Sequence, residues 1–382
     1  MSDLSQSPES DLPALAVKKS VLPSPDESPI LIIGTGRSGT TLLRQMLNAH
    51  PRIYLTHEAS FYLADGVISK QLSNHRYVDQ WLDNYLQTFN PPWAGLDPDQ
   101  IRAQVPTGLA RDRLVEVFRA IMRTKASEYG KPRYGDKTPL HSAHLQRIFE
   151  DFPDPRVIHI VRDPRATVAS LGRMPWASSC VGLNSRFCDI HFKGISLFRE
   201  RIHEIRLEDL LADPRTVMGG VLDFVGEEWD EAVLNHTRHC RSEDVPPFPW
   251  FQNATRERKR SVSSSGSSAK RTDLTPAWVR IVENDNRYAM ETYGYTRTEF
   301  AREPGFLAQQ RARLSELPAA LCFAWRCLRL FMKMRSPEPR KRQEALMMGL
   351  HLNPSAWQNY PGFPIPDIKP FHDLRHPLLR IE

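Results

Sequence analysis

The feature that most constrains this chain is a short apolar strand, a glycine-rich turn and a helix, in that order. Residues 29–33 read PILII, an apolar run typical of a buried parallel strand. A turn from Gly34 to Gly39 follows, and residues 40–48 carry apolar side chains at helical spacing. This arrangement puts backbone N–H groups and a helix N-terminus around a phosphate group. The pattern therefore favours phosphate binding over a glycine-containing turn that binds no ligand.

The turn departs from the phosphate loop of kinases and ATPases at one position. Gly34 and Gly39 have the spacing of GxxxxGK[ST], but Thr40 stands in place of the lysine. A kinase needs that lysine against the β- and γ-phosphates and a hydroxyl on magnesium. The donors that this turn offers instead are Arg37, Ser38, Thr40 and Thr41. We therefore expect a phosphate ester whose transferring group carries less charge than a phosphoryl group.

A second anion site is indicated after the next strong strand, residues 156–161. Arg162 follows this strand, and Ser170 lies about two turns into the helix that Asp163 and Pro164 begin. Ligands of parallel sheets gather at the carboxyl ends of the strands, so both side chains can converge on one phosphate. The alternative is that Arg162 pairs with a carboxylate and Ser170 is a hydroxyl on a helix face.

Strands that alternate with helices predict the α/β class, with a parallel sheet covered by helices on both faces. We expect a disordered leader over 1–28, one α/β domain over 29–297, and a helical, partly irregular C-terminal extension over 298–382. Within the domain, residues 134–139 read as a turn and 140–151 as a helix. Residues 202–207 read as a further strand.

Four motifs together resemble those of sulfotransferases that use 3′-phosphoadenosine-5′-phosphosulfate (PAPS), nearest to the protein-tyrosine-sulfotransferase-like and related bacterial enzymes. The four segments that carry the resemblance are residues 36–51 (GRSGTTLLRQMLNAHP), 137–139 (KTP), 161–165 (VRDPR) with Ser170, and 208–226 from Glu-Asp-Leu to Phe-Val-Gly. They follow the order of the family across residues 29–297. Leu207 stands where many members have a tyrosine, and residues 261–268 form an unusual serine-rich stretch, with Lys270 and Arg271 as weak candidates for late cofactor contacts.

The resemblance implies the P-loop α/β fold in its sulfotransferase variant, with PAPS as co-substrate and no metal. It implies that the 5′-phosphosulfate is held by Arg37, Ser38, Gly39, Thr40 and Thr41. It further implies that Arg162 and Ser170 hold the 3′-phosphate. Glu58 would be the general base, with the adjacent His57 as the alternative, and Lys137 and Arg37 would act at the transferring sulfuryl group.

Composition limits the other functions. The formal net charge is +6 and the sequence pI is about 9.1, which suits an anionic partner of any kind. The basic run 256–260 has no interleaved aromatic residues and no known motif, so no nucleic-acid partner is expected. Five cysteines without a CxxC pair indicate a reduced setting, and no secretory signal is recognised, so we expect a cytoplasmic protein.

Two further segments bear on partners. Residues 59–133 connect Glu58 to Lys137 and are expected to shape the cleft for a small-molecule, carbohydrate, lipid or peptide acceptor. Its candidate lining residues, which are equally good core residues, are Trp81, Phe89 and Trp93. Residues 319–334 read as a basic amphipathic helix, either packed on the domain, which we favour, or lying on a membrane surface.

Two other functions remain open from the sequence. A P-loop nucleotide kinase would need a carboxylate for magnesium at a strand end, and Asp163 is the obvious candidate. A non-catalytic nucleotide-binding module would keep the phosphate loop and tolerate the loss of Glu58 and Lys137, and both are present.

Overall fold

The computed structural model describes residues 28–68, 77–88, 97–107, 113–239 and 273–338, with a few residues between 341 and 355. Almost all of the expected leader, the basic run 256–260, the serine-rich stretch 261–268, Lys270 and Arg271, and the aromatic residues Phe89 and Trp93 lie outside the described residues.

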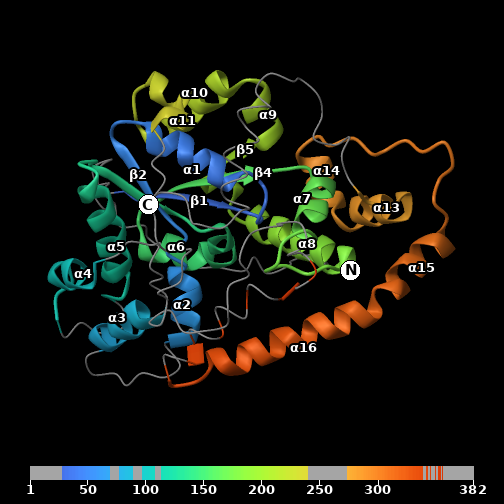
Figure 1. Ribbon diagram of the computed structural model, residues 1–382. Helices are drawn as coiled ribbons and strands as arrows, with labels where there is room; N and C mark the ends of the chain where they lie inside the picture. Colours follow the sequence, from blue (N-terminus) through green and yellow to red (C-terminus); the bar gives the residue numbers. More distant parts are fainter. Residues whose placement is uncertain are drawn as a thin grey trace, which may run out of the picture.

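The centre of the molecule is a five-stranded sheet in the order β2-β3-β1-β4-β5, and every neighbouring pair is parallel (Figure 1). The strands are β1 (Ile30–Gly34), β2 (Ile53–His57), β3 (Arg133–Lys137), β4 (Arg156–Val161) and β5 (His203–Arg206). Because all five run the same way, their carboxyl ends meet at one edge of the sheet. This edge collects the segments that the sequence singled out.

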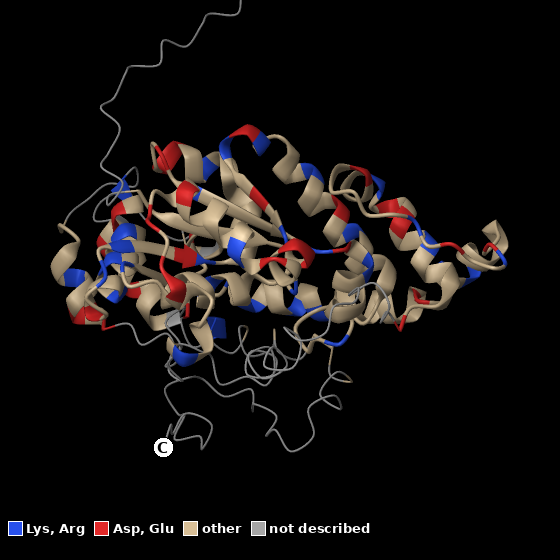
Figure 2. Cartoon of the chain, turned by 90° about the horizontal axis from the view of Figure 1, so that it is seen from above, with Lys and Arg blue, Asp and Glu red and all other residues tan. Residues whose placement is uncertain are grey.

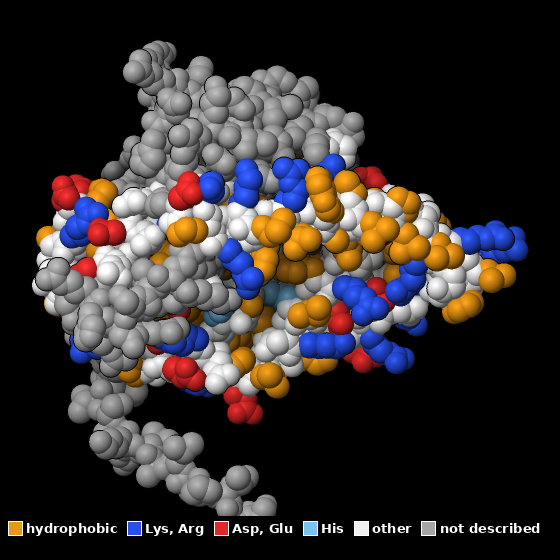
Figure 3. All heavy atoms as spheres, turned by 90° about the horizontal axis from the view of Figure 1, so that it is seen from below, with side chains coloured by type: hydrophobic (Ala, Val, Ile, Leu, Met, Phe, Trp, Pro, Cys, Tyr) orange, Lys and Arg blue, Asp and Glu red, His pale blue; other side chains and the backbone are white. Residues whose placement is uncertain are grey.

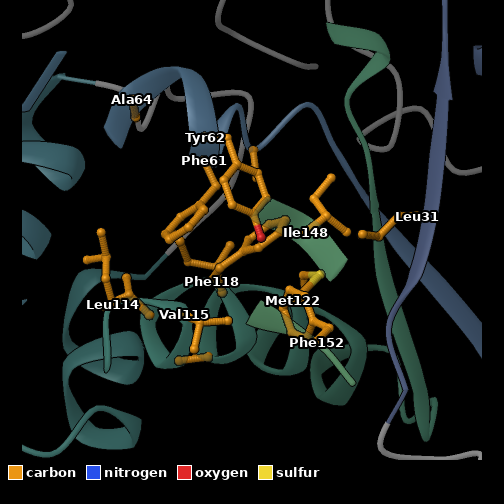
Figure 4. Packing of buried hydrophobic residues seen from close by; sticks show 14 of the residues in the cluster. Leu31, Phe61, Tyr62, Ala64, Leu114, Val115, Phe118, Met122, Ile148 and Phe152 are labelled. Carbon is orange, nitrogen blue, oxygen red and sulfur yellow. The ribbon is translucent and has the colours of Figure 1, made fainter. Parts of the chain in front are cut away.

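Helices cover both faces of the sheet, and the alternation of side chains along β1 shows how. Ile30 and Ile32 point to the face that is covered by α1 (Thr40–Ala49), α9 (Leu207–Ala212) and α10 (Pro214–Val225). Leu31 and Ile33 point to the opposite face. The helical elements packed there are α2 (Phe61–Ile68), α3 (Tyr77–Thr88), α4 (Pro98–Gln104), α5 (Val115–Glu128) and α6 (Leu145–Asp151). The aromatic centre of this second layer, with Phe61, Tyr62 and Phe118, is seen in Figure 4.

The remaining helices flank β4 and β5 or extend beyond them. A third apolar cluster joins the end of β4 to the helices α7 (Pro164–Leu171), α8 (Val181–Ser196), α13 (Pro276–Asp285) and α14 (Arg287–Thr292). Beyond it, α15 (Phe306–Ser315) and α16 (Leu317–Met334) run along the lower side of the molecule (Figure 1). Short helical turns complete the described chain: η5 (Pro139–His144), η6 (Arg199–Arg201), η7 (Glu231–Val233) and α11 (His236–His239).

The α/β class with a parallel sheet is confirmed, as are the strand over 156–161 and the strand near 202–207. The prediction of a turn over 134–139 is wrong, because most of this segment is the buried strand β3. A Cβ at Gly135 would lie 1.9 Å from the carbonyl oxygen of Ile30, so only glycine lets the two strands approach. Gly135, Asp136 and Pro139 are of types typical of turns, and this composition hid the strand.

Histidines with lowered pKa values predict a loss of stability in acid. The pKa of His141 is lowered to about 3 by burial, and those of His57, His159 and His191 also lie below the ordinary value for the same reason. Below pH ~6.5 the unfolded chain binds protons that the folded chain does not, so the free energy of unfolding falls as pH decreases, by about 1.4 kcal/mol per pH unit for each such histidine.

Urea unfolding at several pH values between about 7 and 5 measures this slope. His191→Gln should reduce the slope by the share of one histidine. The matched control His239→Gln, at an exposed site, should leave it unchanged. An identical slope in the wild type and His191→Gln would contradict the assignment.

Candidate active site

The turn between β1 and α1 is built as an anion-binding loop. Gly39 adopts a left-handed φ of 104° and precedes α1 without any side-chain cap, so the helix N-terminus is left for another partner. A Cβ on Gly34 would lie 2.7 Å from Ser38 Oγ, so glycine makes room for that hydroxyl. Among the described residues, the buried hydroxyls of Ser38 and Thr35 have no hydrogen-bond partner. Buried polar groups are normally satisfied, so these two point to a ligand in the loop.

The loop and the expected second anion site are in direct contact. Arg37 Nε donates to Ser170 Oγ at 3.2 Å, and Arg162 Nη1 donates to the carbonyl oxygen of Arg37 at 3.1 Å. Arg37 itself has a left-handed φ of 74°, an uncommon conformation for a residue with a side chain. The structure thus brings together three of the predicted cofactor-binding residues from the ends of β1 and β4.

The carboxylates near Arg162 are occupied by other groups. Glu208 accepts from the Asp163 backbone N–H at 3.0 Å and from the Tyr295 hydroxyl at 2.9 Å. Asp163 caps α7 and accepts three hydrogen bonds from the Arg165 guanidinium, the closest at 2.7 Å. Burial lowers the pKa of Arg162, against the opposing influence of these carboxylates, and its buried Nε has no partner among the described residues. An anion can therefore meet this guanidinium.

Two apolar side chains close around the loop. Leu207, the residue at the position often held by tyrosine, packs on Gly39, whose added Cβ would lie 2.7 Å from Leu207 Cδ1. Trp176 packs on Gly36 in the same way, at 2.8 Å. Leu207 therefore belongs to the packing of the loop.

Glu58 and Lys137 meet at the carboxyl ends of β2 and β3. Lys137 Nζ lies 2.5 Å from Glu58 Oε1 and 3.2 Å from His57 Nε2. The lysine side chain is fully buried, whereas that of Glu58 is 38% exposed. Burial is the main cause that lowers the pKa of Lys137, and the Glu58 carboxylate opposes this shift. A buried cation thus sits beside a carboxylate that solvent can reach.

The backbone that carries Glu58 is held by Asp136. Asp136 Oδ1 accepts from Thr56 Oγ1 at 2.6 Å and from the Ala59 backbone N–H at 3.0 Å, while Oδ2 accepts from Thr138 Oγ1 at 2.7 Å. The Glu58 backbone N–H donates to the carbonyl oxygen of Lys137 at 2.9 Å. Glu58 has a left-handed φ of 54°, so these bonds maintain a conformation that costs free energy.

Four residues of the site were not predicted from the sequence: Asp136, Thr138, Trp176 and Arg173. The charge of Arg173 contributes to the lowered pKa of Arg162. Asp136 and Thr138 flank Lys137, but a segment taken for a turn gave no reason to assign them a structural role. Trp81 is fully buried in the core beneath the sheet. Of its two predicted roles, a core residue or a lining residue of the acceptor cleft, the structure supports the first. Among the described residues, no group of three or more His, Cys, Asp or Glu side chains is placed to hold a metal ion.

The fold and the site define a class: an α/β protein with a P-loop, two joined candidate anion sites and a carboxylate–lysine pair at one sheet edge. A family model described as "Sulfotransferase family" matches residues 29–231, more than half of the chain. The chain belongs to the sulfotransferase family.

Individual relatives agree with the family. A protein-tyrosine sulfotransferase of Drosophila melanogaster is 27% identical over 60% of this chain and 44% of its own length. An omega-hydroxy-beta-dihydromenaquinone-9 sulfotransferase of Mycobacterium bovis is 25% identical over 52% of this chain and 63% of its own length. The chain thus spans about half the length of the curated relatives it matches.

Among solved structures, the sulfotransferase domain of the Synechococcus PCC 7002 olefin synthase aligns at 22% identity. The alignment covers 71% of this chain and 96% of that domain, with a TM-score of 0.45. A TM-score this low carries no argument about the site.

Removal of the Asp136 carboxylate should destabilise the protein by about 2–4 kcal/mol, because buried donors from Ala59 and Thr138 lose their acceptor. Asp136→Asn should cost far less than Asp136→Ala, since the amide oxygen can still accept from the Ala59 N–H. Urea unfolding of the two variants measures the difference. Equal stability of Asp136→Ala and the wild type would show that the network does not hold this turn.

Proposed function

We propose that the protein transfers a sulfuryl group from PAPS to a hydroxyl or amine acceptor. The observation that carries this proposal is the Glu58–Lys137 pair, which lies 2.5 Å apart on the sheet edge that also carries the phosphate loop. Membership of the sulfotransferase family supports the same reaction.

The donor would bind across the ends of β1 and β4. The N-terminus of α1, the Ser38 hydroxyl and the side chains of Thr40 and Thr41 supply donors for the 5′-phosphosulfate. Arg162 and Ser170 supply donors for the 3′-phosphate. Arg37 bonds to Ser170 and offers its backbone oxygen to Arg162, so it links the two ends of the donor site.

The chemistry is an in-line displacement at sulfur. An oxygen of the acceptor forms a bond to sulfur, the bond from sulfur to the phosphate oxygen breaks, and adenosine 3′,5′-bisphosphate leaves with the electron pair. The acceptor's proton passes to Glu58, whose exposed carboxylate is accessible from solvent. Once Glu58 is protonated, it no longer neutralises Lys137. The buried ammonium can then stabilise the charge that develops on the leaving oxygen.

His57 is a weaker candidate for the base. Burial, with the nearby charges of Lys137 and Arg44, holds the pKa of His57 well below its ordinary value. The neutral ring accepts a hydrogen bond from Lys137 through Nε2, so the lone pair that a base would use is engaged. In this proposal His57 helps to orient the lysine.

The competing functions find less support. A kinase would need Asp163 as a magnesium ligand, but this carboxylate is taken by Arg165 and the start of α7. A non-catalytic module would have no need of a strained Glu58 held against a buried lysine. Nucleic-acid binding would favour one basic face, whereas Figure 2 shows acidic and basic residues interspersed over the helices seen from above.

The acceptor is proposed only as a class. The relatives are named for acceptors as different as protein tyrosine and a menaquinone derivative, so a small-molecule, carbohydrate, lipid or peptide hydroxyl suits the family. The cytoplasmic location also stays a proposal. It is supported by the four described cysteines, Cys180, Cys188, Cys322 and Cys327, all of which are unpaired.

Adenosine 3′,5′-bisphosphate should raise the melting temperature without magnesium, and more than ATP with magnesium does, because a ligand of the native state stabilises it by mass action. In Arg162→Ala, stabilisation by the bisphosphate should largely disappear, while that by adenosine 5′-monophosphate should change little. Thermal shift with the three nucleotides measures both effects. Equal stabilisation by ATP would favour a kinase, and equal losses for both adenosine ligands in Arg162→Ala would make this arginine structural.

Glu58→Gln should lower turnover by about 10²–10⁴-fold, because the amide cannot accept the proton of the acceptor. Its affinity for adenosine 3′,5′-bisphosphate should stay nearly unchanged, since the base faces the acceptor. Lys137→Ala should also lower turnover with at most a modest loss of affinity.

The measurements are transfer of labelled sulfate from PAPS to a mixed acceptor extract, and calorimetry of bisphosphate binding. The control is Glu228→Gln. Glu228 is exposed, its backbone oxygen contacts His50 at the C-terminal end of α1, and the variant should behave as the wild type. Near-normal turnover of Glu58→Gln would move the base to another residue.

A further inference from the structure

Helix α16 presents an apolar face that nothing in the described part of the chain covers. Six large apolar side chains recur on one side of this helix, and each is about half exposed or more: Leu317, Leu321, Trp325, Leu328, Phe331 and Met332. Their spacing of three and four residues keeps them on one side from Leu317 to Met332, about 24 Å of helix. We favoured a helix packed on the domain for residues 319–334. Met334 is the one buried residue of α16, so packing on the domain does not account for the apolar face.

The start of the helix is anchored to the domain. Glu316, just before α16, accepts from the backbone N–H groups of Val181 and Gly182 at 2.7 and 3.0 Å, at the start of α8. Arg313 in α15 pairs with Asp285 of α13 at 2.9 Å. These contacts fix the start of α16 against α8 and the preceding helix against α13.

Basic side chains run along one edge of the apolar face. Arg329 and Lys333 lie about 40° to 80° beyond Trp325 around the helix axis, and the Arg329 guanidinium lies 4.8 Å from the centroid of the Trp325 ring. Figure 3 shows the apolar row on the lower face with a line of Lys and Arg beside it. From Leu317 to Arg335 the sequence contains four basic residues and no acidic one.

We propose that α16 is a docking surface for an anionic lipid bilayer. A long exposed apolar strip with basic residues along its edge matches a helix that lies in the interface, with apolar groups among acyl chains and cations at the headgroups. No described helix combines the length and apolar character that crossing a membrane requires. A second copy of the chain fits less well, because the same strip offers no carboxylate to the basic edge.

The test is co-sedimentation of the full chain with vesicles of phosphatidylcholine alone or enriched in phosphatidylserine. The wild type should bind the anionic vesicles and hardly bind the neutral ones, and salt should weaken the binding. Leu321→Glu with Trp325→Glu should lower partitioning by about tenfold or more, and Arg329→Glu should weaken binding to anionic vesicles only. Leu211→Glu, at an exposed leucine of α9 on the other side of the sheet, should bind as the wild type does.

Two results would overturn the proposal. One is unchanged vesicle binding by the Leu321→Glu, Trp325→Glu double variant. The other is a stable dimer of the wild type in sedimentation equilibrium that the same double variant dissociates, since the strip would then be a self-interface. The mutated side chains are exposed, so the melting temperature should stay unchanged. Its measurement verifies that each variant is folded. None of these measurements requires sulfuryl transfer.

Discussion

The close approach of β3 to β1 at Gly135 is the constraint on which the site depends. A Cβ at Gly135 would lie 1.9 Å from the Ile30 carbonyl oxygen, so glycine permits the pairing in which Lys137 lies opposite Ile32. Through the same register β3 carries β2, whose last residue, His57, pairs with Lys137. Glu58, Lys137 and the phosphate loop lie at one edge of the sheet because the strands are parallel, and Gly135 lets β3 approach β1 closely enough to join them.

Electrostatics at this edge follow from burial. Lys137 is removed from water, and an isolated buried ammonium would be costly, so the Glu58 carboxylate and the neutral His57 ring compensate for it. Asp136, also buried, accepts the hydrogen bonds that keep the following turn in place. The Glu58 carboxylate therefore has two parts: it makes the buried lysine tolerable, and in the proposed reaction it accepts the proton of the acceptor.

Segments beyond the family match complete the other end of the site. Glu283 of α13 pairs with Arg165 at 2.7 Å, and the Tyr295 hydroxyl donates to Glu208. These contacts occupy the carboxylates around the end of β4 and leave Arg162 for an anion. Farther along the chain, α16 forms a surface whose large apolar side chains remain about half exposed or more. The proposed donor site thus depends on contacts from beyond residue 231, whereas the apolar side chains of α16 stay exposed.

The sequence by itself determined the α/β class and the strand–turn–helix order of the phosphate loop, because these depend on local order. It placed Arg162 and Ser170 near the end of one strand, and their role as a second anion site rested on the resemblance. It also indicated Glu58 and Lys137, but only through resemblance, since 79 residues separate them along the chain. Tertiary structure alone decided that Lys137 lies in a buried strand, that Asp136 supports Glu58, and that Leu207 packs on Gly39. Each of these depends on which strands become neighbours and how closely they approach, and the strand order of a parallel sheet cannot be derived from the side-chain pattern of any single strand.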